Sequence, residues 1–180
     1  DPYIRLYNEY FGGGMNAIVF QEMREARGLA YSASGSLIEP EHKDDSYKYF
    51  AFIATQNDKM QIAIQAFDEI INEMPESETA FNIAKEALMT SIRTQRITGR
   101  NILNSYRNTR EMGLTEHRSK KIYEVLPTLT LEDVKATQDK WVEGRTYHYG
   151  ILGDIKDLDT KYLSTLGPVT TLTLEEIFGY

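Results

Sequence analysis

Arg24 and Tyr31 lie seven positions apart, at the two ends of the segment Arg-Glu-Ala-Arg-Gly-Leu-Ala-Tyr. A guanidinium and a phenol both donate hydrogen bonds, so the two side chains, if brought together, could hold the carbonyl oxygen of a peptide. From the spacing alone we favour a plainer interpretation, in which Arg24 forms an ordinary salt bridge at a helix end and Tyr31 lies on a buried strand edge. Arg27, beside Gly28, is interpreted as a structural residue that satisfies the last carbonyls of a helix.

The residues around this pair predict a helix, a stop and a strand. Asn16 can cap a helix with an apolar side, Gly28 can end it, and an extended segment follows from Leu29. The arginine and the tyrosine would then reach one site from two rigid elements. The Gly-Gly-Gly run at residues 12–14 lacks the lysine and the serine or threonine of a P-loop. We therefore interpret it as a turn or a site of close packing.

Apolar periodicity along the rest of the chain predicts an α+β fold, with a mixed or antiparallel sheet packed against helices. Asp58, Ser77 and Thr130 are the expected capping residues of three later helices. We expect helices from residue 2 and over residues 58–74, 77–98, about 102–106, 130–143 and 157–166, and strands over 29–38, 46–56, 146–152 and 169–174. Residues 39–45 should form the turn of a hairpin, and the aromatic side chains of the strand at 46–56 should lie in the core, covered on both faces.

Two parts of the sequence resemble a known family. One is the Gly-Gly-Gly run followed by Phe-Gln-Glu-Met-Arg-Glu-Ala-Arg-Gly-Leu-Ala-Tyr at residues 20–31. A weaker match combines residues 126–134, which lead into a helix, with Tyr-Gly-Ile-Leu-Gly-Asp at 149–154. In these features the chain resembles the C-terminal, non-zinc half of the pitrilysin-type metallopeptidases, the inverzincins. That family includes the mitochondrial processing peptidases and the insulin-degrading enzymes.

The resemblance implies that Arg24 and Tyr31 are the catalytic residues that this chain supplies. Tyr31 would donate its hydroxyl to the developing oxyanion, and Arg24 would bind a substrate carbonyl or help to hold Tyr31. The implied partners are a peptide substrate and a zinc-bearing domain or subunit with an H-x-x-E-H helix, without which this chain should be inactive. We expect residues 1–180 to be one C-terminal peptidase-like domain, and a piece of a longer polypeptide, because the family's leading strand is absent.

Two other functions stay open. The chain could be a catalytically silent homologue that serves as a scaffold or assembly subunit, although both residues of the pair are retained, which weighs against this. It could also be a free-standing peptide-binding module that uses an exposed sheet edge.

The histidines do not form a zinc-binding pattern. His42, His117 and His148 are scattered, and the nearest approach to H-x-x-E-H, at residues 113–117, has glycine in place of the first ligand. Catalytic zinc takes about three protein ligands. We therefore expect no metal site and no cofactor in this chain, and zinc in the partner half.

Composition argues against several classes of partner. The net charge is −7, from 20 basic and 27 acidic residues, so a general affinity for nucleic acid or anionic membranes is not expected. No run approaches the roughly 20 apolar residues of a membrane span. The absence of cysteine removes disulfides and thiolate chemistry but leaves the compartment open.

The charge reverses locally between Arg93 and Lys121. This stretch contains eight basic residues and only two acidic ones, Glu111 and Glu116. The pattern fits either a solvated helix face or an electropositive cavity wall that would attract an acidic peptide or partner.

Overall fold

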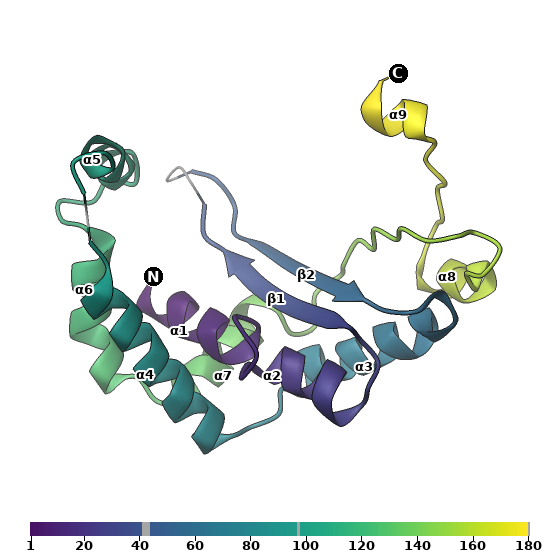
Figure 1. Cartoon of the computed structure of the whole chain (residues 1–180), viewed down its shortest axis with the longest axis horizontal. Coiled ribbons are helices and arrows are strands. Elements are labelled where there is room, and N and C mark those ends of the chain that lie inside the picture. The colour runs from purple at the N-terminus through teal and green to yellow at the C-terminus, as the bar shows by residue number, and fades with distance from the viewer. Residues whose placement is uncertain (41–43, 97, 180) are drawn as a thin grey trace.

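The protein folds as a two-stranded antiparallel sheet laid on a group of helices, as seen in a computed structural model that describes residues 1–40, 44–96 and 98–179 (Figure 1). The α+β prediction is confirmed, with a sheet that is antiparallel rather than mixed within these residues. The strands are β1 (Ser32–Ile38) and β2 (Lys48–Ala54). The α-helices are α1 (Pro2–Phe11), α2 (Ile18–Phe20), α3 (Met60–Asn72), α4 (Glu78–Thr94), α5 (Ile102–Glu111), α6 (Arg118–Val125), α7 (Leu131–Trp141), α8 (Thr160–Leu166) and α9 (Leu174–Phe178). A π-helix spans Gln21–Ala26, and 3₁₀ turns span Asn57–Lys59 and Leu126–Thr128.

Helix α1 lies at the centre of the core. It begins at Pro2, which suits the first turn of a helix, and the side chain of Asp1 accepts a hydrogen bond from the backbone N of Tyr3 at 2.9 Å. The helix contacts α4, α7 and β1. Its inward side chains are at most 1% exposed: Ile4, Leu6, Tyr7, Tyr10 and Phe11.

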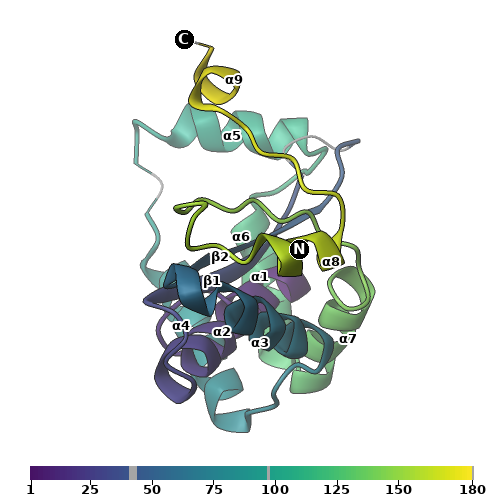
Figure 2. The ribbon, with the colours of Figure 1, turned by 90° about the vertical axis from the view of Figure 1, so that its right-hand side faces the viewer.

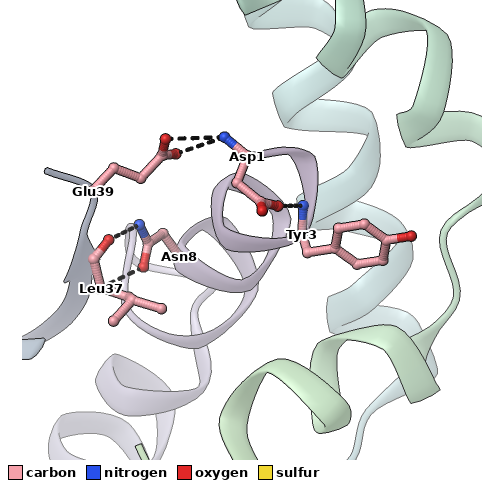
Figure 3. Close-up of polar contacts among 5 residues, drawn as sticks. All are labelled: Asp1, Tyr3, Asn8, Leu37 and Glu39. Atoms are coloured by element: carbon pink, nitrogen blue, oxygen red, sulfur yellow. Dashed lines mark hydrogen bonds and ion pairs between the residues drawn. The ribbon is translucent and has the colours of Figure 1, made fainter. Parts of the chain in front are cut away.

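Asn8 joins α1 to the sheet through both backbone groups of one residue (Figure 3). Its Nδ2 donates to the carbonyl of Leu37 at 2.9 Å, and the backbone N of Leu37 donates to its Oδ1 at 2.8 Å. The end of α1 also lies very close to β1, because a Cβ added at Gly12 would be 1.9 Å from the carbonyl oxygen of Gly35. The close packing expected of the glycine run is therefore confirmed at its first residue.

The hairpin is covered by helices on one face only. The register pairs Ser34 with Phe52 and Ser36 with Phe50, and these four residues lie on the face that points away from the core. Phe50 is 60% exposed and Phe52 is 50% exposed. The prediction that the aromatic residues of this strand lie in the core is wrong for both phenylalanines, because alternate residues of a strand point to opposite faces and only one face is covered. The predicted turn lies partly outside the described residues, which omit 41–43.

Two of the three predicted helix caps are confirmed. The Ser77 hydroxyl accepts from the backbone N of Ala80 at 3.2 Å at the start of α4, and the backbone N of Thr130 donates to Asp133 at 2.8 Å at the start of α7. Asp58 is not a cap, because it lies inside a 3₁₀ turn and makes no capping hydrogen bond. Helix α4 also ends at Thr94, before the predicted boundary at residue 98.

The two predicted C-terminal strands are wrong. Residues 146–152 and 169–173 are irregular and pair with no described strand, and Leu174, the last residue of the second predicted strand, begins α9. The predicted helix between the two segments forms as α8. In the first segment the hydroxyl groups of Tyr147 and Tyr149 donate to the Val142 carbonyl and, at 3.3 Å, to Asp68. Alternating aromatic residues can thus anchor a loop as well as a strand. Helices α5, α8 and α9 bury none of their residues, and α9 extends away from the body of the molecule (Figure 2).

Candidate functional site

A π-helical segment carries Arg24. Helix α2 continues directly into the π-helix, and Gly28 ends it with a φ of +59°, a left-handed conformation that suits glycine because it has no Cβ. The predicted stop is therefore confirmed. The predicted cap at Asn16 is wrong, because the helix starts after Ala17 without a side-chain cap. π-Helical turns are rare and are often found at functional sites.

Backbone hydrogen bonds fix the turn between the π-helix and the sheet. The carbonyl of Met23 accepts from the backbone N of Leu29 at 2.9 Å and from that of Ala30 at 3.2 Å. The backbone N of Tyr31 then donates to the carbonyl of Ala54 at 2.8 Å. Tyr31 is therefore held to β2 immediately before β1 begins.

Arg24 and Tyr31 lie together on the surface. The Arg24 Cζ is 5.4 Å from the centroid of the Tyr31 ring and 5.0 Å from that of the Phe20 ring, which are cation–π distances. Tyr31 is 80% exposed, so the plainer interpretation of a buried strand-edge tyrosine is wrong. The contact with Phe20 was not predicted, although its spacing of four residues from Arg24 on one helix could have suggested it.

Hydrogen-bond donors of the pair remain available to a ligand. The Arg24 Nε is 3.6 Å from Glu25 Oε1, and both side chains are exposed, so this ion pair is weak. Within the described part of the chain, no hydrogen bond occupies the Tyr31 hydroxyl. An exposed phenol and a weakly paired guanidinium can each donate to a peptide carbonyl.

Arg27 has a structural role. Its Nη1 is 2.7 Å from Glu69 Oε2 on α3, and its Nε is 3.7 Å from Glu22 Oε2. These contacts tie the π-helix to α3. The structural interpretation of Arg27 is confirmed, but its partners are carboxylates and not the last carbonyls of the helix.

A second polar cluster consists of four tyrosines and one carboxylate: Tyr7, Tyr49, Tyr147, Tyr149 and Asp68. Burial raises the pKa of Tyr147 to about 12 and places that of Tyr7 and Tyr49 well above the ordinary value for a phenol. Burial also raises the pKa of the Asp68 carboxyl, against the opposing effect of its hydrogen bond with Tyr149. A cavity of about 570 Å³ lies nearby, lined by β2, α3 and the loop after α7. These phenols stay neutral near pH 7, which suits packing with a polar tip and not general base catalysis.

The two described histidines, His117 and His148, belong to no cluster that could hold a metal. In the residues that the structure describes, no group of three or more His, Cys, Asp or Glu could hold a metal ion. His117 starts α6, where its Nδ1 accepts from the backbone N of Ser119 at 3.3 Å. His148 is exposed, and His42 lies outside the described residues. Of the helices described, none is long and apolar enough to cross a membrane.

The comparison with family models decides the identity of the first half of the chain. Residues 3–88 match the family described as the peptidase M16 inactive domain. These residues are an M16 inactive domain. The resemblance to the C-terminal half of the pitrilysin family is thereby confirmed. The M16 inactive domain contains α1, the hairpin, Arg24 and Tyr31, and it is the non-catalytic type of domain in its family.

A solved structure shares the fold. The crystal structure of a peptidase M16 inactive domain from Pseudomonas fluorescens matches with a TM-score of 0.60 and 21% sequence identity. The match covers 77% of this chain and 33% of that chain, so this chain spans about a third of the length of that structure. The comparison with curated proteins found no match.

Proposed function

We propose that this M16 inactive domain is the substrate-binding half of a two-part zinc peptidase. Arg24 and Tyr31 reach an active site whose zinc ligands belong to another domain or subunit. Tyr31 donates its hydroxyl to the oxyanion that develops on the scissile carbonyl, and Arg24 holds the ring of Tyr31 and donates to a nearby peptide carbonyl. The described residues offer no group that would hold zinc, so the metal belongs to the other half and this chain alone does not cleave peptides.

The stacking of Arg24 on the exposed ring of Tyr31, at 5.4 Å, carries the proposal. An oxyanion is stabilised best by a donor that is in position before the reaction begins. The cation–π contact and the backbone hydrogen bond to Ala54 restrict Tyr31 while leaving its hydroxyl free.

The alternative is a catalytically silent scaffold or assembly subunit. A family described as inactive suits both functions, because in each the chain itself holds no catalytic metal. They differ in whether the assembly cleaves peptides and whether cleavage depends on Arg24 and Tyr31.

The test is peptide cleavage by the natural assembly, captured through a tag on this chain. We expect a chelator to stop cleavage by the wild type. Tyr31→Phe removes one oxyanion donor and keeps the ring, so turnover should fall by about 100- to 1,000-fold, equivalent to roughly 2.7–4 kcal/mol, with little change in KM. Arg24→Ala should lower turnover and also raise KM, because it loses a contact with the substrate.

Two matched controls use exposed residues outside residues 3–88. Tyr106→Phe and Arg100→Ala remove the same groups from or near α5 and should leave cleavage unchanged. Each variant must be captured with the same partners as the wild type. If the assembly never cleaves, or if Tyr31→Phe and Arg24→Ala cleave as fast as the wild type, the pair is structural and the scaffold function replaces this proposal.

A further inference from the structure

Residues of α4, α5 and α6 line a polar cavity of about 330 Å³. These three helices lie toward one end of the molecule (Figure 1). Five parts of the chain line the cavity: α1 through Arg5, the end of α4 with the two residues that follow it, α5 with its N-terminal neighbour Asn101, the α5–α6 connection through Leu114, and α6 with the residue before it. Neither Arg24 nor Tyr31 is among its lining residues, so an inference drawn from this cavity is independent of the proposed function.

The cavity is lined by three arginines, and no carboxylate is among its described lining residues. The arginines are Arg5, Arg96 and Arg118. The Arg96 Nη1 donates to the backbone carbonyls of Arg93 at 3.0 Å and Gln95 at 3.2 Å, which are neutral acceptors. Within the described chain, neither Arg5 nor Arg118 forms an ion pair. The cavity therefore collects positive charge in a protein whose net charge is −7.

The two acidic residues of the surrounding basic stretch are already paired elsewhere. Arg107 Nε is 3.6 Å from Glu111, and Lys120 Nζ is 2.6 Å from Glu116. None of these four residues lines the cavity. The described lining thus holds three guanidinium groups and no carboxylate, and a concave wall of one sign attracts an anion.

Neutral hydrogen-bonding groups complete the lining. Four side-chain amides, from Gln95, Asn101, Asn104 and Asn108, face the cavity with several hydroxyl groups. The Ser119 hydroxyl donates to Gln95 Oε1 at 3.2 Å, which ties α6 to the end of α4 across one wall. Arginines from separate elements with amide donors between them suit an anion that carries several acceptor oxygens.

We propose that this cavity binds a small molecule that carries a phosphate group, with Arg5 and Arg118 as its charged contacts. A phosphate presents at least three acceptor oxygens and close to two negative charges, which matches several guanidinium groups better than a single carboxylate does. The volume is near the lower end of small-molecule sites, which begin at about 300 Å³, so it accommodates such a molecule but not an extended acidic peptide.

The test is calorimetric titration of the protein with pyrophosphate in a phosphate-free buffer at constant ionic strength. We expect the wild type to bind, and Arg5→Gln and Arg118→Gln each to weaken binding by about tenfold or more, as expected for a lost charge-assisted hydrogen bond. The matched control is Lys121→Gln, which removes one positive charge from α6 at a residue that does not line the cavity. It should change affinity by no more than about twofold, because exposed charges are screened by salt.

Folding of each variant is checked by its far-ultraviolet circular dichroism and its unfolding midpoint without ligand. Equal loss of affinity in Lys121→Gln and Arg118→Gln would show attraction to the general charge of the region and would overturn the proposal. Absence of pyrophosphate binding would also overturn it. So would binding of a glutamate-rich peptide that depends on Arg118 while pyrophosphate does not compete, because the occupant would then be an acidic chain.

Discussion

Gln138 offers the sharpest test of how α7 packs against the M16 inactive domain. The side chain is 2% exposed, its Oε1 accepts from the Tyr7 hydroxyl at 2.6 Å, and its Nε2 donates to the carbonyl of Ile71. Gln138→Leu keeps the size but leaves a buried phenol without an acceptor and a buried carbonyl without a donor. Each such group costs about 1–3 kcal/mol, so the free energy of unfolding should fall by about 2–6 kcal/mol.

Urea unfolding of a double-mutant cycle measures this effect. Tyr7→Phe alone removes the phenol but leaves the Gln138 Oε1 without its donor, whereas in the double variant only the Ile71 carbonyl loses its partner. The double variant should therefore lose less free energy of unfolding than the sum of the two single variants, by about 1 kcal/mol or more. Asp139→Ala, at the exposed neighbouring position of α7, is the control and should change stability by less than about 0.5 kcal/mol. A Gln138→Leu variant as stable as the wild type, or a fully additive cycle, would refute the reasoning.

Two further predictions concern stability. Gly12→Ala should lower the free energy of unfolding by about 1–3 kcal/mol or more, because the new Cβ would meet the Gly35 carbonyl. Gly14→Ala is the control and should have little effect, because nothing lies within 4 Å of its new Cβ. Equal urea midpoints for the two variants would contradict this prediction. Burial raises the pKa of Tyr147 from 10.0 to about 12, so in this range the folded state binds more protons than the unfolded state and stability should fall as the pH rises. Tyr147→Phe should make that decline shallower in unfolding curves at alkaline pH, unlike Tyr106→Phe at an exposed site; parallel declines would count against it.

Local features of this chain were predictable because they depend on neighbouring residues. Ser77 caps a helix because its hydroxyl reaches a backbone N–H within one turn, and Thr130 starts a helix in a capping box with Asp133, three residues further on. Gly28 stops a helix because its own φ is positive. Arg24 meets Tyr31 because one short turn joins the π-helix to the sheet. The helix, stop and strand pattern predicted that the two side chains could reach one site, whereas their spacing alone favoured separate structural roles. The cap predicted at Asp58 was wrong because Asp58 lies inside a short 3₁₀ turn, which precedes α3 and takes the place of a capping residue.

The sequence by itself determined the α+β class, most of the helices, and the Arg24–Tyr31 pair, since each rests on periodicity or on contacts a few residues apart. Only the tertiary structure decided which faces are covered, because that depends on elements distant in the chain. Phe50 and Phe52 alternate as core residues would, yet no described element covers their face of the sheet. The alternation at residues 146–152 likewise does not make a strand, which requires a backbone partner that periodicity does not specify.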